Sequence, residues 1–217
     1  MVLHGAGSCK ENHHDYARAA TAFGLAAIVF DQRGHGASLG PMDDRALEDI
    51  AMIAAALRSA LRDERAPIAL RGSSMGGCLA IAAAAPCRAG AVVAICPASP
   101  EGLARGVRTG AMSFAVYPAA FDRLLANIDL EGVVRSLEVP LLLLHAEGDE
   151  QVPVAHTRRL AARMQSGASR LVIVPDGHHR SIQHDEQLQT QSLQFIVQSL
   201  AGALAGGSLG KGSLGKE

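Results

Sequence analysis

Residues 72–76 read Gly-Ser-Ser-Met-Gly and place Ser74 in a Gly-x-Ser-x-Gly pattern, between an apolar run at 67–70 and an alanine-rich stretch. A serine nucleophile at the end of a buried strand needs a sharp turn, and small residues on either side leave room for that turn. A helix that follows would aim its N-terminal amides at a developing oxyanion. The pattern alone also fits a turn whose glycines merely permit close packing, so its meaning depends on a later acid and histidine.

An acid follows in Asp149, directly after the apolar run 141–144. The acid of a catalytic triad must be rigid enough to orient a histidine, and a loop that leaves a central strand supplies that rigidity. Glu147 and Glu150 are the alternatives on the same loop, and we expect them to be surface charges. The sequence therefore predicts Asp149 as the acid.

Two adjacent histidines, His178 and His179, follow the last apolar run and the pair Asp-Gly at 176–177. A histidine on such a loop can reach both a serine and a carboxylate, so one of the two should be the general base. The other would pack or form hydrogen bonds. No carboxylate or cysteine lies at metal-ligand spacing from these histidines or from the pair at 13–14, so no metal is predicted.

The turn His-Gly-Ala-Gly at 4–7 follows the first apolar run. It would point the backbone N–H of Ala6 toward the serine, and the N–H of Met75, directly after the nucleophile, would be the second oxyanion donor. A further loop, Asp-Gln-Arg-Gly-His-Gly-Ala-Ser at 31–38, is predicted to be scaffold, with charged residues that bond to loops beneath the site.

Short apolar runs alternate with helical patterns along the chain. Expected strands are 2–4, 26–30, 68–71, 91–96, 141–145 and 171–175, and expected helices are 13–23, 43–62, 75–85, 154–165 and 184–200. Continuous apolar strands that alternate with helices predict an α/β fold with a mostly parallel, doubly wound sheet. Ligands bind at the carboxyl ends of such strands, where all the candidate residues fall.

One domain is predicted over residues 1–204. Residues 97–139 break the alternation, are rich in proline and glycine, and are expected to form a lid over the site. Residues 205–217 contain a doubled Gly-Ser-Leu-Gly-Lys unit and are expected to be a flexible tail.

Composition narrows the class of protein. With 48% hydrophobic and 19% charged residues in 217, the chain is expected to be globular, and a net charge of −1 without basic clusters argues against nucleic acid as a partner. No apolar run reaches the roughly 18 residues that span a membrane. The start of the chain shows no signal-peptide pattern. The four cysteines lack metal or disulfide spacing and are expected to be small buried side chains, so a cytoplasmic location is predicted.

Together these motifs resemble the α/β-hydrolase-fold serine hydrolases, in their esterase-like branch, over nearly the whole of residues 2–200. The matching elements are His4-Gly5-Ala6-Gly7, Asp31-x-Arg33-Gly34-His35-Gly36-x-Ser38, Gly72-x-Ser74-x-Gly76-Gly77, Gly148-Asp149-x-x-Val152-Pro153 and Gly177-His178. The resemblance implies Ser74 as nucleophile, Asp149 as acid, His178 as base and the amides of Ala6 and Met75 as oxyanion hole. It implies no metal or organic cofactor.

The family usually has two further strands before the His-Gly turn, and this chain begins three residues ahead of it. Either the start is truncated or those strands are absent. Residues 26–30 would then be an exposed sheet edge, from which we expect self-association.

The predicted function is hydrolysis of an ester-type acyl bond in a small to medium substrate, through an acyl-enzyme on Ser74. Two alternatives stay open on sequence alone. The same triad could transfer the acyl group to another acceptor or perform perhydrolysis, or the chain could be a catalytically silent binding protein of the same fold.

Overall fold

The computed structural model describes residues 1–209, with side chains as far as residue 204. Its centre is a parallel sheet of five strands in the spatial order β1-β2-β3-β4-β5. The strands are β1 (Val2–Leu3), β2 (Ile68–Ser73), β3 (Ala89–Ile95), β4 (Leu141–Ala146) and β5 (Arg170–Val174). The prediction of a mostly parallel α/β sheet is confirmed.

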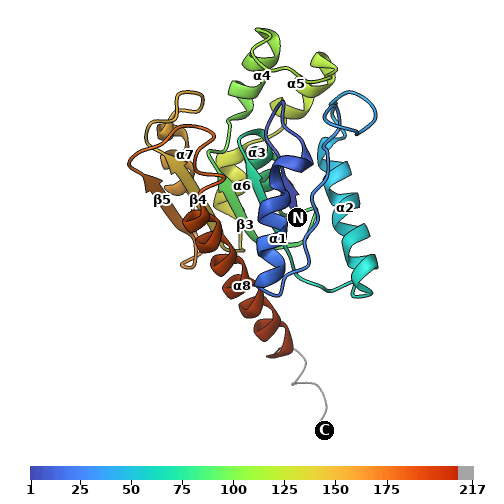
Figure 1. Cartoon of the computed structure of the whole chain (residues 1–217), viewed down its shortest axis with the longest axis vertical. Coiled ribbons are helices and arrows are strands. Elements are labelled where there is room, and N and C mark those ends of the chain that lie inside the picture. Colours follow the sequence, from blue (N-terminus) through green and yellow to red (C-terminus); the bar gives the residue numbers. More distant parts are fainter. Residues whose placement is uncertain (210–217) are drawn as a thin grey trace.

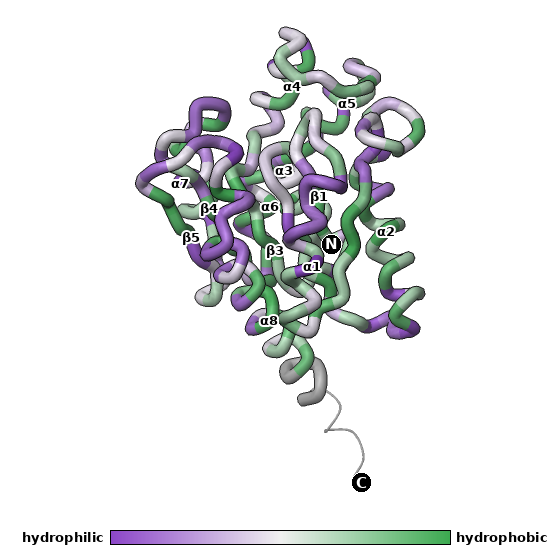
Figure 2. The backbone as a smooth tube through the Cα atoms, viewed as in Figure 1, coloured by the Kyte–Doolittle hydropathy of each residue, from purple (hydrophilic) through white to green (hydrophobic). Residues whose placement is uncertain are grey.

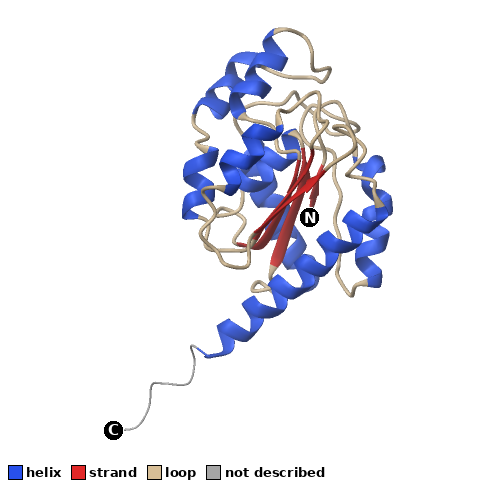
Figure 3. Cartoon of the chain, turned by 90° about the vertical axis from the view of Figure 1, so that its left-hand side faces the viewer, coloured by secondary structure: helices blue, strands red, loops and turns tan. Residues whose placement is uncertain are grey.

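Helices cover both faces of this sheet, which Figure 3 shows edge-on between them. The core on one face includes residues of α2 (Ala46–Leu61), α3 (Met75–Ala82), α6 (Leu130–Ser136) and α7 (Val154–Ala161). On the other face lie α1 (His14–Ala22) and α8 (Glu186–Leu209), and α1 follows directly on a short 3-10 helix, Lys10–His13. This two-sided cover explains why the central strands are apolar along their whole length.

The inner strands are buried except for Gly90 in β3, which is half-buried, and β3 has the hydrophobic colour at the centre of Figure 2. Every residue of β4 is buried, whereas β5 at the sheet edge is half-buried or exposed. Polar loops follow the carboxyl ends of β4 and β5, at residues 147–151 and 176–180. The sheet thus offers a rigid apolar base for the polar loops that carry the candidate site.

The predicted strand at 26–30 is wrong in extent. Its pairing with β1 is reduced to a single parallel bridge between Val29 and Val2 and a hydrogen bond of 3.0 Å from the N–H of Val2 to the carbonyl of Ile28. β1 itself is two residues long, so it offers too few partners to extend a ladder. The segment still lies at the β1 edge of the sheet, as expected.

The predicted insertion 97–139 adds no strand to the sheet within the described residues. It forms α4 (Pro100–Arg108) and α5 (Pro118–Ala126), which stand together at the top of Figure 1, and then α6, which packs on α3. Ser99 caps α4 by accepting a hydrogen bond of 3.0 Å from the N–H of Gly102, and Pro100 occupies the first turn.

The final helix α8 runs to Leu209 and so enters the predicted tail 205–217, of which residues 210–217 lie outside the described part of the chain. No helix among the described residues is long and apolar enough to cross a membrane.

Candidate active site

Ser74 sits at the junction of β2 and α3 in a strained backbone conformation, with φ of 53° and ψ of −117°. Positive φ is costly for a residue with a side chain and persists where the surrounding structure enforces it. Hydrogen bonds hold the turn: the N–H of Ser74 donates to the carbonyl of Ile95 at 2.9 Å, and the carbonyl of Ser74 accepts from the N–H of Ala98 at 3.1 Å. The sharp strand-to-helix turn predicted from the sequence is present.

Two glycines make this turn sterically feasible. A methyl group on Gly72 would overlap the backbone of Gly76, and one on Gly76 would overlap the carbonyl oxygens of Leu3 and His4. The glycine positions of the pattern are therefore required because β2, α3 and the end of β1 meet there without space for a side chain.

The turn after β1 lies directly against the serine. A methyl group on Gly5 would lie 3.4 Å from Cβ of Ser74. Neither the N–H of Ala6, next in this turn, nor the N–H of Met75, first in α3, donates a hydrogen bond to any described residue. Both predicted oxyanion donors are therefore unpaired amides in the two turns that meet at Ser74.

The side chain of His4 stabilises that turn through hydrogen bonds. Its Nε2 accepts from the N–H of Gln32 at 3.0 Å, which leaves the proton on Nδ1 to be donated to the carbonyl of Gly5 at 2.8 Å. The side chain of Gln32 donates to the carbonyl of His4 at 2.6 Å. Burial lowers the pKa of His4 to about 4, so the ring is neutral at neutral pH.

Charged side chains of the loop 31–38 pair with residues outside the loop, as expected for a scaffold. Asp31 accepts from the backbone N–H and the Nζ of Lys10, and Arg33 donates two hydrogen bonds of 2.8 Å to Asp49 in α2. Burial opposes ionisation of Asp31, but the hydrogen bonds from Lys10 outweigh it and lower its pKa to about 2. These ion pairs tie the loop to the rest of the fold.

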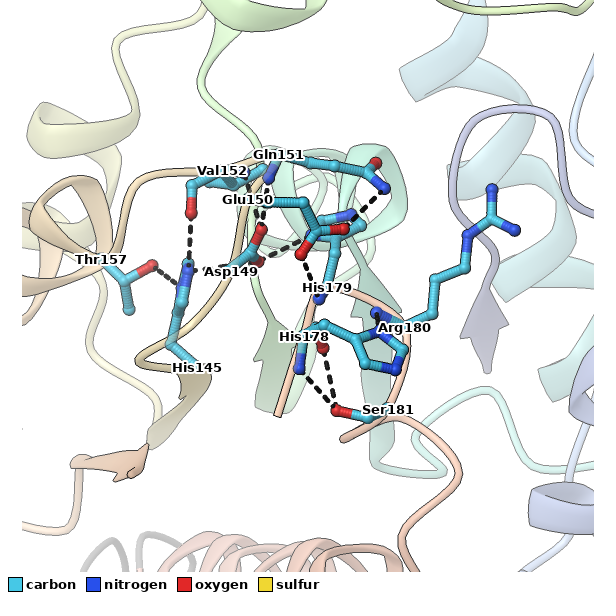
Figure 4. Close-up of polar contacts among 10 residues, drawn as sticks. All are labelled: His145, Asp149, Glu150, Gln151, Val152, Thr157, His178, His179, Arg180 and Ser181. Carbon is cyan, nitrogen blue, oxygen red and sulfur yellow. Dashed lines mark hydrogen bonds and ion pairs between the residues drawn. The ribbon is translucent and has the colours of Figure 1, made fainter. Parts of the chain in front are cut away.

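Asp149 lies at the end of β4 with its carboxylate fully buried and surrounded by donors. Oδ1 accepts from the N–H groups of Gln151 and Val152, each at 2.8 Å, and Oδ2 lies 2.7 Å from Nδ1 of His179 (Figure 4). Burial alone would raise the pKa of Asp149, but hydrogen bonds, those of the histidines foremost, hold it well below its usual range. Asp149 is therefore ionised and paired with a histidine.

That histidine is not the one chosen from the sequence. The side chain of His178 is exposed, and its ring nitrogen Nδ1 faces the backbone N–H of Arg180 at 3.4 Å. His179 is 8% exposed and faces the acid. The geometry therefore pairs His179, and not the predicted base His178, with the predicted acid.

The local turn explains the difference. Gly177 adopts φ of 109°, and the hydroxyl of Ser181 accepts from the N–H of His178 and donates to its carbonyl, both at 2.9 Å. This compact turn directs His178 outward and His179 inward. The acid and base loops also touch at a pair of glycines, since a methyl group on Gly148 would lie 2.6 Å from the carbonyl oxygen of Gly177.

The Nε2 of His179 makes no hydrogen bond to Ser74 or to another described residue. Contacts of this kind are often loose before substrate binds. Ser74 and Asp149 instead both lie near the end of β3: the N–H of Ser74 donates to the carbonyl of Ile95, and the thiol of the next residue, Cys96, lies within 4.8 Å of a carboxylate oxygen of Asp149.

Sequence reasoning missed two side chains beside Asp149, namely Cys96 and His145. Their ligand atoms and a carboxylate oxygen of Asp149 lie within 4.8 Å of one another, a spacing that a metal ion could use. However, burial raises the pKa of the Cys96 thiol, and Nε2 of His145 faces the carbonyl of Val152 at 3.0 Å. A protonated thiol and an N–H donor make this a hydrogen-bond cluster. The sequence offers one indication of a role for His145, namely that it is a polar residue directly after the apolar run 141–144.

Comparison with known proteins agrees with this fold. The fold and the strand-end serine define an α/β hydrolase. A family model described as serine aminopeptidase, S33, matches residues 1–115, and one described as the prolyl oligopeptidase family matches residues 117–203. The chain belongs to the serine aminopeptidase S33 family of α/β hydrolases.

Similar sequences include YfhR of Escherichia coli O157:H7, 25% identical over 190 residues, and YqkD of Bacillus subtilis, 27% identical over 196. The matches cover 80% and 82% of this chain but 61% and 64% of those proteins, so the chain spans less than two thirds of their length.

Solved structures share the fold. A monoacylglycerol lipase from Paleococcus ferrophilus has a TM-score of 0.73 at 17% identity, and the match covers 91% of this chain and 93% of the lipase. Est1E from Butyrivibrio proteoclasticus, solved with ferulic acid bound, has a TM-score of 0.71 at 24% identity, with 92% and 88% covered.

Proposed function

We propose that the chain is a serine hydrolase that cleaves a carboxylic ester through an acyl-enzyme, with Ser74 as nucleophile, His179 as base and Asp149 as acid. The observation that carries this proposal is the combination of a strained, glycine-flanked serine with a buried histidine–carboxylate pair on the adjoining loops. Strain of this kind gathers at functional sites because it exposes a reactive side chain.

In this mechanism Oγ of Ser74 attacks the carbonyl carbon of the ester while Nε2 of His179 takes the hydroxyl proton. The carbonyl oxygen becomes an oxyanion that accepts hydrogen bonds from the N–H groups of Ala6 and Met75. His179 then gives its proton to the leaving alcohol oxygen as the bond to carbon breaks. A water molecule, deprotonated by the same ring, releases the acid and restores Ser74.

Asp149 keeps the base in the required state. Its Oδ2 accepts from Nδ1 of His179, which leaves the Nε2 lone pair free for the serine proton. When His179 becomes an imidazolium, the ionised carboxylate stabilises its charge.

We expect an apolar acyl group, because an aromatic side chain of the insertion lies near the turn at residues 4–7. Phe114 of the insertion stacks on His35, with ring centroids 4.5 Å apart, and His35 lies 4.8 Å from the ring of His4. The carbonyl of Ser113 comes within 3.3 Å of where a methyl group on Gly7 would be. The insertion therefore reaches the turn at 4–7, which contains Ala6, one of the two proposed oxyanion donors. The lipase and the ferulate-bound protein of the same fold make an ester the first substrate class to test.

A peptide or aminoacyl amide is the second candidate substrate, because both matching family models are named after peptidases. The same triad would cleave it, with the proton going to a leaving amine.

The test is a panel of p-nitrophenyl esters of increasing acyl length beside aminoacyl p-nitroanilides, measured as kcat/KM. The proposal expects turnover of the esters, with a preference set by acyl length. Turnover of the anilides alone would mean that the substrate is an amide and not an ester. If no substrate is turned over and a fluorophosphonate does not label the protein, serine catalysis is contradicted.

A further inference from the structure

His145 is a completely buried histidine at the end of β4, and the mechanism above does not use it. Its Nδ1 lies 2.6 Å from Oγ1 of Thr157 in α7. Its Nε2 lies 3.0 Å from the carbonyl oxygen of Val152 and 3.3 Å from Oδ2 of Asp149 (Figure 4). Both ring nitrogens are therefore engaged, and one of them faces the proposed catalytic acid.

The partners of His145 decide its tautomer. The carbonyl of Val152 and the ionised carboxylate of Asp149 can only accept hydrogen bonds, so the Nε2 that faces both must carry a proton. In a neutral ring Nδ1 is then the acceptor, and the hydroxyl of Thr157 is the donor it faces. Thr157 is fully buried, which leaves that hydroxyl few other partners.

Asp149 Oδ2 consequently lies between two imidazoles. Nδ1 of His179 is at 2.7 Å on one side and Nε2 of His145 at 3.3 Å on the other. The N–H of His145 makes its hydrogen bond to the carbonyl of Val152, and Oδ2 of Asp149 is a second, longer contact of the same N–H. The positive end of this N–H dipole stabilises the charge on Oδ2, so the carboxylate attracts the proton of His179 less strongly.

We propose that His145 is a positioning residue for the acid: its Nε2–H holds the Asp149 carboxylate in line with His179 and limits how strongly that carboxylate draws a proton onto the base. This inference rests on the proposed function. The consequence is a base that stays unprotonated to lower pH than it would beside a carboxylate without this donor.

The other ionisable groups around this pair come from four segments. Cys96 directly follows β3, His156 precedes Thr157 in α7, and Glu150 belongs to the acid loop, where it accepts from the N–H of His179 at 3.4 Å. His178 and Arg180 flank His179 on the base loop, and both are exposed. Burial raises the pKa of Cys96 and lowers that of His156, so both are uncharged at neutral pH. Glu150 is exposed, and its charge is screened by solvent.

The experiment compares His145→Phe, which keeps a ring but loses the donor, with His145→Gln, which keeps an N–H donor at the end of the side chain. The dependence of kcat/KM on pH is measured with p-nitrophenyl butyrate. We expect the acidic limb of His145→Phe to move up by about half to one pH unit, a roughly 3- to 10-fold loss at a pH on that limb, while His145→Gln keeps the wild-type limb.

The control is His156→Phe, which removes a buried neutral histidine from the same neighbourhood without touching Asp149, and its limb should stay in place. The proposal is overturned if the His145→Phe limb coincides with that of the wild type, or if Phe and Gln shift it equally.

A second measurement needs no turnover, and its signal is assigned by its loss from His145→Phe. In wild-type protein labelled with 15N-histidine, NMR should show a buried ring protonated on Nε2 and unprotonated on Nδ1 near neutral pH. A His145 protonated on Nδ1 would overturn the proposal. Because this readout is independent of substrate, an enzyme that cleaves no ester would contradict the proposed function while the NMR result still decides the role of His145.

Discussion

Nδ1 of His179 lies 2.7 Å from Oδ2 of Asp149, while His178, its neighbour in sequence, turns its ring outward. This one contact distinguishes two histidines that share a loop and a residue type. It also identifies which ring has a second nitrogen free to act on Ser74.

We predict that His179→Ala loses about 10⁴-fold or more in kcat, because the residues of a triad act as a unit. His178→Ala should stay within a few-fold of the wild type, since its ring contacts no catalytic group in the described structure. The two variants are measured side by side on one activated ester, with circular dichroism to confirm folding. An inactive His178→Ala beside an active His179→Ala would reverse the assignment.

Local pattern was enough to predict the sharp turn at Ser74 and the position of Asp149 after a buried strand, because both depend on residues nearby in the sequence. The serine needs glycines two positions away, and the acid follows a buried strand directly. The choice between His178 and His179 depends on the turn at Gly177 and on the cap by Ser181, and both sequence positions satisfy the same pattern. Which side chain points inward is a property of that turn.

The alternation of apolar runs and helices was enough to predict a parallel sheet with helices on both faces. It did not predict how long the strands at the edge of the sheet are. Residues 26–30 have the composition of a strand, yet ladder formation needs a partner, and two-residue β1 provides one bridge. The sequence also did not indicate a role for His145, because that role depends on contacts with Thr157 and Asp149, which lie in other segments of the chain.

The insertion should set acyl-chain preference. Phe114→Ala removes the ring that stacks on His35, which widens the space beside the turn at 4–7. We expect the ratio of kcat/KM for octanoyl over butyryl esters to change by roughly fivefold or more. A ratio is used because it is unaffected by loss of folded protein. Tyr117→Ala is the control, since Tyr117 is 57% exposed. Equal ratios in all three proteins would show that Phe114 does not contact the acyl group.

Acid should destabilise the fold through its buried histidines. Burial lowers the pKa of His4 to about 4, and burial together with Arg71 lowers that of His13 to about 3. The unfolded chain, whose histidines titrate near pH 6.5, binds protons that the folded chain excludes, so stability is full above about pH 6.5 and falls from there toward pH 4.

Between its unfolded and its folded pKa, each of these histidines lowers the free energy of unfolding by about 1.4 kcal/mol for each pH unit of acidification. His13→Gln should therefore flatten the decline by one such increment, as measured by urea unfolding at pH 7, 6 and 5. Parallel slopes for the variant and the wild type would mean that His13 is protonated in the folded protein.

We propose that the β1 edge of the sheet mediates self-association. The segment 26–30 lies between a hollow of about 250 Å³ beside Leu39 and Met52 and one of about 480 Å³ beside Leu61 and Leu204. Leu39 is 91% exposed and Met52 70%, and exposed apolar side chains beside a sheet edge favour association.

Sedimentation velocity should show an average mass that rises with concentration for the wild type and falls in the double variant Leu39→Glu, Met52→Glu. Tyr117→Glu, a charge added to an exposed side chain of the insertion, should associate as the wild type does. A wild-type chain that is monomeric at every concentration would contradict the proposal.

Labelling of Ser74 by a fluorophosphonate tests the central claim most directly, because the probe reacts with a serine that its surroundings have activated. The account predicts one label per chain, mapped to Ser74 by mass spectrometry, and loss of both labelling and ester hydrolysis in a folded Ser74→Ala variant, by about 10⁴-fold or more in kcat. Retained turnover in Ser74→Ala, or a label on another serine, would contradict it.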